Sequence, residues 1–433
     1  MNHSPQSMAT DPTQATPSCP HFGLCGGCQL QHLPYAAQLA AKAAQLRALL
    51  EAASLALPEL QLHPSPPLAY RNRIRLTLSE VGGQLRAGYL SNQQPATSNQ
   101  QPNFLPVTQC PIAAPILWRA AEALLALLNR RAATWREHAP FTLDQLELFA
   151  APQDAPAEAR LQISLFGRTS AKQLPARFGA ELASLCESLR LDIPALAGAG
   201  LYLIPPRSAR SRRAEQPRHG PAWGAPGLNY IVPTQNLSHS PLPLSVLQPA
   251  TNNLQPATCY WVPRGAFFQV NRFLLPKLLA LVTANRTGTL AWDLYAGVGL
   301  FTNALAPHFT RITAVEIAEL AFTALASGSK AGKLPNRRAV KSTTLDFLRA
   351  AVIQRDRPDL IVLDPPRTGA GPEICALLAR IAAPTLIYVS CSPETLPADL
   401  ATLAASGYRV AELHLLDLFP QTTHIETVAI LTR

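Results

Sequence analysis

The alternation of apolar and polar residues divides the chain into segments with different predicted structures. Residues 35–57 carry apolar side chains at helical spacing and end before Pro58, which predicts an amphipathic helix. A period of two follows in IRLTLSE and in QLRAGYL, and Gly82 and Gly83 join the two runs. This pattern predicts a β-hairpin, because paired glycines permit the backbone of a tight turn.

The pattern changes at about residue 265, where short apolar runs alternate with longer helical stretches. Four such runs are TLAWDLYA, RITAVEI, LIVLDPP and TLIYVSC, and enough chain separates them for crossover helices. This alternation is typical of a parallel, doubly wound α/β sheet. Because ligands of such sheets bind beyond the carboxyl ends of the strands, the residues at those ends are candidates for a site.

Several polar segments interrupt the predicted elements. Residues 1–18 are rich in Ser, Thr, Gln and Pro, which predicts a disordered lead-in. Residues 91–103 and 247–258 are polar and repetitive, with LQPAT occurring twice in the second, and both are predicted to be loop insertions. The basic residues 207–220 predict a solvated loop, with contact to phosphate as the alternative.

The length of the chain indicates how many domains to expect, and its net charge bears on nucleic-acid binding. A chain of 433 residues is about two to three times as long as a common domain, so we expect more than one folding unit. We predict a cysteine segment and helix at 19–60, a central α+β domain at 61–262 and a doubly wound domain at 263–433. The net charge of +10 fits a polyanion partner and also many proteins without one, so charge alone leaves nucleic-acid binding open.

The sequence carries no sign of export or of a membrane anchor. The N-terminus lacks a basic start followed by an apolar stretch, and no apolar run approaches the roughly 18–20 residues of a membrane span. Eight cysteines are too few for a disulfide scaffold in a chain of this length. We therefore expect a monomeric, cytoplasmic protein of a reducing compartment, without a membrane partner.

Glycines and carboxylates follow three of the predicted strands. Gly297 and Gly299 come directly after the first strand, where they permit a tight turn and the close approach of a ligand. Glu316 ends the second strand, where a carboxylate can accept both hydroxyls of a ribose, and Asp364 ends the third. Each alone has an ordinary structural explanation. Together they predict a nucleoside pocket, and a GxG spacing without a third glycine favours a mononucleoside such as S-adenosylmethionine.

A cysteine and a glutamate complete this edge of the predicted sheet. Cys391 ends the fourth strand ahead of a predicted helix, where a lowered pKa would make its thiol a nucleophile; the alternative is a small apolar residue at a strand end. His424 and Glu426 precede the C-terminal strand, and Glu426 is either a general base or a surface acid. A nucleophile and a base beside a methyl donor suit methylation of uracil at C5. Addition of a thiolate to C6 makes C5 nucleophilic, C5 then accepts the methyl group, and a base removes the C5 proton.

Three cysteines near the N-terminus have a spacing typical of metal or cluster ligands. Cys19, Cys25 and Cys28 are separated by five and then two residues, with glycines that allow a tight turn. Cys110 is the best candidate for a fourth ligand. Four thiolates bind zinc or a [4Fe–4S] cluster, and their chemistry alone does not choose between them. The other three cysteines are expected to be structural: Cys186, Cys259 and Cys375.

Four motifs, DLYAGVGLFT, DPPRTG, YVSCSPET and HIETVAIL, resemble in order and spacing the S-adenosylmethionine-dependent RNA uracil-5-methyltransferases, which form 5-methyluridine in transfer and ribosomal RNA. The resemblance covers about residues 19–433 and implies a Rossmann-like methyltransferase domain at the C-terminus. It also implies that Cys391 is the nucleophile and Glu426 the base. The residues it implies for the methyl donor are Gln269, Tyr295, Glu316 and Asp364. Beside Gln269, Phe267 and Phe268 are expected to be core.

The branch of this family that acts on 23S ribosomal RNA is the most similar. It implies a [4Fe–4S] cluster on the four cysteines and ribosomal RNA as the substrate. A transfer RNA substrate, a methyltransferase for another class of substrate and a non-catalytic RNA-binding protein with a cluster remain the alternatives. Members of this branch often begin with a small β-barrel, where this chain has 18 residues before Cys19, and usually have Asn where Ser392 stands.

RNA is expected to bind the central domain, at about residues 60–262. Phosphate contacts would position it, and a looped or single-stranded target would let the base flip out. Arg71, Arg73 and Arg75 alternate along one predicted strand and therefore share a face. A solvated strand face is the alternative interpretation of these three cations.

Overall fold

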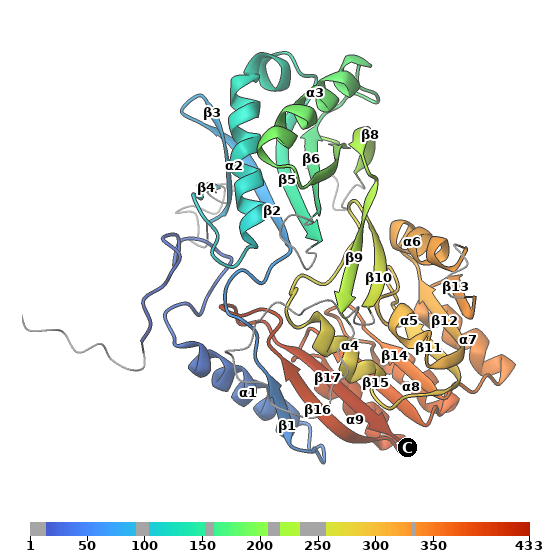
Figure 1. Ribbon diagram of the computed structural model, residues 1–433. Helices are drawn as coiled ribbons and strands as arrows, with labels where there is room; N and C mark the ends of the chain where they lie inside the picture. The colour runs from blue at the N-terminus through green and yellow to red at the C-terminus, as the bar shows by residue number, and fades with distance from the viewer. Residues whose placement is uncertain (1–13, 92–103, 152–159, 207–216, 234–256, 331–334) are drawn as a thin grey trace, which may run out of the picture.

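The computed structural model describes residues 14–91, 104–151, 160–206, 217–233, 257–330 and 335–433. Within them, an eight-stranded sheet fills the lower part of Figure 1, a seven-stranded sheet fills the upper part, and a two-stranded ribbon runs between the two. Most of the predicted lead-in and of the three predicted loops lies outside the described residues.

The eight-stranded sheet has the order β1-β16-β17-β15-β14-β11-β12-β13. Its strands are β1 (Leu60–His63), β11 (Gly288–Leu294), β12 (Phe309–Glu316), β13 (Arg337–Lys341), β14 (Leu360–Leu363), β15 (Thr385–Ser390), β16 (Arg409–Leu416) and β17 (Glu426–Thr432). The four apolar runs of the sequence form β11, β12, β14 and β15, which pair in parallel. The prediction of a doubly wound parallel α/β sheet is therefore confirmed.

Helices cover both faces of this sheet (Figure 1). They are α1 (Tyr35–Ala52), α4 (Leu275–Thr283), α5 (Leu300–Leu305), α6 (Glu319–Lys330), α7 (Thr344–Gln354), α8 (Pro372–Ile381) and α9 (Leu396–Ala405). Neighbouring residues of β15 belong to different apolar clusters: Ile387 packs with α4 and α5, and Tyr388 packs with α7 and α8. Burial on both faces explains why the strands are continuous apolar runs. None of the helices in the described residues is long and apolar enough to cross a membrane.

The N-terminal helix and strand belong to this C-terminal core. The helix predicted at residues 35–57 is α1, which ends at Ala52, and its buried Leu46 and Leu50 join the cluster of α8 and α9. β1 pairs in parallel with β16, with Leu60 opposite Leu413. The predicted boundary between residues 60 and 61 therefore differs from the structure, because helical periodicity shows that one face is buried but not which domain buries it.

The seven-stranded sheet has the order β4-β3-β2-β5-β6-β7-β8 and carries two helices on one face (Figure 1). Its elements are β2 (Arg73–Val81), β3 (Gln84–Leu90), β4 (Phe104–Pro106), α2 (Pro115–Arg130), a short π-helix (Ala133–Glu137), β5 (Thr142–Ala151), β6 (Arg160–Arg168), α3 (Arg177–Asp192), β7 (Leu196–Ile204) and β8 (Arg218–Gly224). The predicted hairpin is β2 and β3. At its turn, Gly82 and Gly83 both have positive φ, as expected.

Two predicted loops end earlier than the sequence suggested. The ribbon consists of β9 (Gly227–Pro233) and β10 (Ala257–Pro263), so the last two residues of the predicted loop 247–258 are strand. Likewise, β8 begins at Arg218, inside the predicted loop 207–220. Thr258 pairs with Val232 and Arg218 with Leu203, so neighbouring strands supply backbone hydrogen bonds that a polar composition does not reveal.

Candidate active site

The carboxyl ends of β11, β12, β14 and β15 meet at one edge of the eight-stranded sheet. Cys391 directly follows β15, and Glu426 is the first residue of β17, which runs antiparallel to β15. Ser390 pairs with Thr427, so one further step in the same register places Cys391 opposite Glu426. Strand register thus brings together the two residues that the sequence predicts as nucleophile and base.

Carboxyl groups at this edge influence one another. Glu426 is 2% exposed, and its burial together with the charge of Asp364 raises its pKa well above the usual value, against the opposing effect of Arg367. Burial, followed by the charge of Asp293, raises the pKa of Asp364 to about 7. Negative charge is therefore costly at this edge of the sheet, and burial shifts both pKa values upward.

The thiol of Cys391 is half-buried and resists ionisation. Burial, followed by the charges of Glu426 and Asp364, raises its pKa to about 11, while Arg367 acts in the opposite direction. The predicted lowering of this pKa is wrong. The helix that was expected to stabilise a thiolate begins only at Leu396, beyond the reach of its first turn. The resting thiol is therefore protonated at neutral pH and must lose its proton before it attacks a substrate.

Ser392 stands where the resembling family usually has Asn. It is buried, and its hydroxyl lies 3.1 Å from Glu394 Oε2, to which it donates. Its N–H donates to the hydroxyl oxygen of Ser390 at 3.2 Å, and that hydroxyl donates to the carbonyl of Ser392. The polar groups of Ser392 thus hold the turn that presents Cys391.

The turn after β11 has the backbone that the sequence predicts. Gly297 and Gly299 have φ values of 56° and 92°. The Gly297 N–H donates to Glu316 Oε2 at 2.8 Å, and the Ala318 N–H donates to Oε1 at 2.6 Å. Each carboxylate oxygen keeps a further lone pair, and the space beside the Cα of Gly297 is open. This arrangement suits a carboxylate that accepts the vicinal hydroxyls of a ribose.

The two other residues implied for the methyl donor are Gln269 and Tyr295. Gln269 is largely buried, and its carbonyl accepts a 2.9 Å hydrogen bond from the side-chain amide of Asn72. Tyr295 has a φ of 63°, and its ring packs against the apolar cluster that includes residues of α7 and α8. Burial raises the pKa of Tyr295, while its hydrogen bond with Thr344 opposes that shift. Both residues are thus held in place by neighbours outside the turn.

Asp293 is a fully buried carboxylate that the sequence did not single out. Its Oδ2 accepts hydrogen bonds from the N–H of Thr302, at 2.8 Å, and from the hydroxyl of the same residue. Its Oδ1 has no hydrogen-bond partner among the described residues, and burial raises its pKa to about 7. The one signal in the sequence is an acidic residue inside the apolar run TLAWDLYA.

Phe267 and Phe268 differ in burial. Phe268 is 1% exposed and belongs to the core, as expected, whereas Phe267 is 68% exposed. The expectation that both are core is therefore wrong for Phe267. Only the ring of Phe268 joins the apolar cluster around α4 and α5. The result is an apolar ring at the surface two residues before Gln269.

The four cysteines predicted as ligands line a common cavity of about 80 Å³. Burial raises the pKa of Cys28 to about 11, and the charges of Cys110, Cys25 and Cys19 contribute to that rise, so the four thiols are close enough to interact. None of the described residues that line the cavity is Asp or Glu, and one of them is Arg71. The other three cysteines lie elsewhere: Cys186 and Cys375 are buried and Cys259 is exposed.

The same cysteines do not form a ready site for a single ion. In the part of the chain that the structure describes, no group of three or more His, Cys, Asp and Glu side chains is arranged to hold a metal ion. A structural zinc site needs four thiolates at about 2.3 Å from one centre.

The three arginines predicted to share a strand face have different surroundings. Arg71 lines the cysteine cavity. Arg73 lies over the ring of Phe149, 4.4 Å from its centroid, and 3.4 Å from Glu147 Oε1. Arg75 lies over the ring of Phe166 and is the exposed member of the three. β2 begins at Arg73, so Arg71 lies before the strand on which the three were predicted to alternate, and contact with RNA phosphates stays a prediction.

Known proteins with similar sequences are RNA methyltransferases. Residues 255–433 match the family described as tRNA (Uracil-5-)-methyltransferase. The 23S rRNA (uracil(1939)-C(5))-methyltransferase RlmD of Chromohalobacter salexigens is 29% identical over 436 residues, which cover 100% of this chain and 79% of the relative. An uncharacterized RNA methyltransferase of Thermotoga maritima is 36% identical over 177 residues, 40% of each chain.

One solved structure has the same overall fold. The Pyrococcus abyssi tRNA (uracil-54, C5)-methyltransferase, determined in complex with S-adenosyl-L-homocysteine, has a TM-score of 0.65 and 21% identity. The match covers 95% of this chain and 86% of that one, and at this identity it shows the fold alone. The resemblance predicted from the sequence motifs is confirmed: residues 255–433 match the model of the tRNA (Uracil-5-)-methyltransferase family, and relatives named as uracil-C5 methyltransferases match almost the whole chain.

Proposed function

We propose that this protein transfers a methyl group from S-adenosylmethionine to C5 of a uridine in RNA, with 23S ribosomal RNA as the substrate. The observation that carries the proposal is the register that sets Cys391 opposite Glu426, at the same edge of the sheet as the glycine turn and Glu316. Relatives named as 23S rRNA uracil-C5 methyltransferases match almost the whole chain, which supports ribosomal over transfer RNA.

The chemistry assigns one task to each of the two residues. Cys391, once deprotonated, adds through sulfur to C6 of the uracil and converts the ring into an enolate that is nucleophilic at C5. C5 then takes the methyl group from the donor sulfonium, which leaves as the neutral thioether S-adenosylhomocysteine. Glu426 removes the proton from C5, the C5–C6 double bond forms again, and the thiolate leaves. The sum is methylation at C5 with release of one proton.

The electrostatics of the site suit the last step. A general base works best when its pKa lies near the working pH, and burial with a neighbouring Asp364 raises that of Glu426 from its usual low value. The same carboxyl groups raise the pKa of Cys391, which makes the thiolate a strong nucleophile once it forms. Burial thus has two effects: it opposes ionisation of the Cys391 thiol, and it raises the pKa of Glu426, which favours removal of the C5 proton.

Unmodified RNA transcripts test the proposed substrate. We expect 5-methyluridine, measured by mass spectrometry of digested nucleosides, when the protein and S-adenosylmethionine are incubated with a 23S ribosomal RNA transcript. Transfer RNA transcripts at the same concentration serve as the comparison. Methylation of transfer RNA alone would move the assignment to that substrate. RNA binding without any 5-methyluridine would favour a non-catalytic protein.

The proposal includes a [4Fe–4S] cluster held by Cys19, Cys25, Cys28 and Cys110. The charges of the other three cysteines help to raise the pKa of Cys28 in the shared cavity, and bound iron would stabilise such thiols as thiolates. A cluster with four thiolates is anionic, and the half-buried Arg71, whose Nε has no partner among the described residues, supplies positive charge at the cavity wall. When bound, the cluster would tie the N-terminal segment to the loop that carries Cys110.

Replacement of Cys28 by serine tests the cluster. The parent protein, purified without oxygen, is expected to contain iron and acid-labile sulfide. The Cys28→Ser variant, purified in the same way, should contain much less of both, because one ligand is missing. Cys259→Ser changes an exposed cysteine on β10 and should retain both. Zinc in place of iron in the parent, or iron retained by Cys28→Ser, would contradict the assignment.

A further inference from the structure

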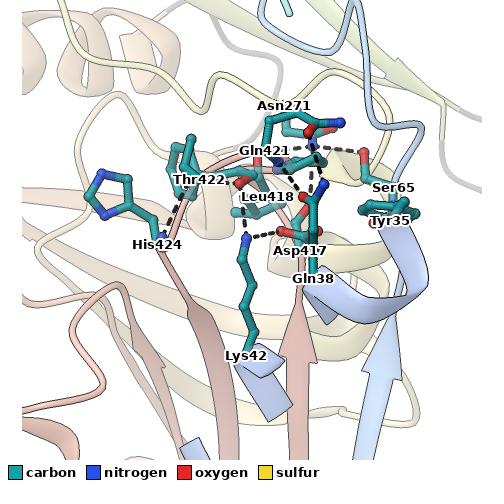
Figure 2. Close-up of polar contacts among 12 residues, drawn as sticks. Tyr35, Gln38, Lys42, Ser65, Asn271, Asp417, Leu418, Gln421, Thr422 and His424 are labelled. Carbon is teal, nitrogen blue, oxygen red and sulfur yellow. Dashed lines mark hydrogen bonds and ion pairs between the residues drawn. The ribbon is translucent and has the colours of Figure 1, made fainter. Parts of the chain in front are cut away.

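A buried ion pair joins the N-terminal helix to the loop between β16 and β17 (Figure 2). Lys42 Nζ lies 2.7 Å from Asp417 Oδ1, and the two side chains are 2% and 0% exposed. The same Nζ donates to the carbonyl of Phe419 at 3.0 Å. A buried ion pair contributes little net stability compared with apolar residues of similar size, so its presence calls for another explanation.

The carbonyl of Phe419 is an acceptor shared with the chain that leads to Glu426. The Thr422 hydroxyl donates to it at 2.8 Å, and the N–H of His424 donates to the Thr422 hydroxyl oxygen at 3.3 Å. The ring of His424 also packs edge-on against the ring of Phe419, with centroids 5.7 Å apart. From Lys42, an unbroken path of contacts therefore reaches His424, two residues before Glu426.

A second set of bonds from the N-terminal segment holds Gln421 in the same loop. Gln38 on α1 donates from Nε2 to Gln421 Oε1 at 2.9 Å and accepts from the Gln421 N–H at 3.0 Å (Figure 2). The Gln421 carbonyl accepts from the N–H groups of Gln29 and Leu30, directly after Cys28. Gln421 has a φ of 67°, a conformation that a residue with a side chain keeps only where neighbours impose it.

The loop is also tied to the donor side of the site. The side-chain amide of Asn271 donates to the Leu418 carbonyl at 3.0 Å and to the Ser65 hydroxyl oxygen at 2.9 Å. Asn271 is fully buried and lies two residues after Gln269. The network thus connects the loop before Glu426 with the segment implied for the methyl donor.

We propose that Lys42 is a positioning residue for Glu426, acting through the Phe419 carbonyl to set the loop 417–424. This inference rests on the proposed function, because it requires Glu426 to act as the base. It gives α1, an N-terminal helix that packs in the C-terminal core, a role in the chemistry at the sheet edge. A lysine that served only to neutralise the Asp417 carboxylate would not need the second bond, in which Lys42 donates to the Phe419 carbonyl.

The test separates loop positioning from the burial of charge. Lys42→Met leaves the Asp417 carboxylate buried and unpaired, so its melting temperature is expected to fall. The double variant Lys42→Met/Asp417→Asn removes both charges and should recover most of that loss. Neither variant restores the bond to Phe419. We therefore expect the double variant to melt near the parent and still to remove the C5 proton roughly tenfold to a hundredfold more slowly.

The measurement is the covalent adduct between enzyme and RNA, seen as a shifted band on a denaturing gel. Slow proton removal lets the methylated adduct accumulate, whereas a general loss of folded protein lowers adduct and product together. Arg47→Met, an exposed change on the same helix, is the matched control. A double variant that melts normally and releases product at the parental rate would overturn the inference. If Glu426→Gln also fails to trap an adduct, the proposed mechanism fails rather than the role of Lys42.

Discussion

Replacing Cys391 by alanine is expected to abolish formation of both the covalent RNA adduct and 5-methyluridine. Without the sulfur, C6 has no nucleophile, and C5 of an unactivated uracil does not attack the methyl donor. Loss of a nucleophile in other enzymes lowers the rate by about 10⁴-fold or more, so product should fall below detection in a single-turnover assay. The measurement is 5-methyluridine formed per enzyme chain with the preferred RNA.

The controls for this prediction use the other cysteines and the fold. Cys259→Ala removes an exposed cysteine away from the edge and should leave turnover unchanged. Cys391→Ala itself should fold, because the residue is half-buried and the change leaves a small side chain. Cys391→Ser keeps the shape but offers a much weaker nucleophile. Full activity in the serine variant would contradict the covalent mechanism and would favour a methyltransferase that acts on another class of substrate.

The sheet and its functional edge could be predicted from the sequence because local pattern reflects them. Apolar runs of strand length alternate with helical stretches, and glycines or acids follow where the strands end, as at Gly297 and Glu316. Parallel strands bring such ends to one edge whatever their order in the sheet. Cys391 could therefore be assigned to this edge, whereas Glu426, which begins the antiparallel β17, was assigned to the same site by the resemblance of its motif.

Properties that depend on distant partners could not be predicted in this way. The pKa of Cys391 follows from its burial and from Glu426 and Asp364, and only the fold sets those. In an alanine-rich helix Lys42 has the pattern of a solvated residue, yet its partner Asp417 lies near the other end of the chain. The packing of α1 on the C-terminal sheet belongs to the same class, since periodicity does not name the partner of a buried face.

Conversion of Glu426 to glutamine is expected to trap the methylated adduct between Cys391 and RNA. An amide has nearly the same shape as the carboxyl group, which matters at a position that is 2% exposed, but it cannot accept the C5 proton. Removal of a general base slows its step by about 10²–10⁴-fold. Addition and methyl transfer precede that step, so the adduct should persist and should carry a methyl group from labelled donor.

The sign of the electrostatic effect strengthens this expectation. The charge of Glu426 raises the pKa of Cys391, so its loss in Glu426→Gln should lower that pKa and make addition at least as easy as in the parent. The variant thus affects the two halves of the reaction in opposite directions. If the adduct is transient in the parent and stable in the variant, Glu426 acts in a step that follows methyl transfer. A folded variant that forms no adduct would instead place Glu426 before or at the attack by Cys391, which contradicts the role proposed here.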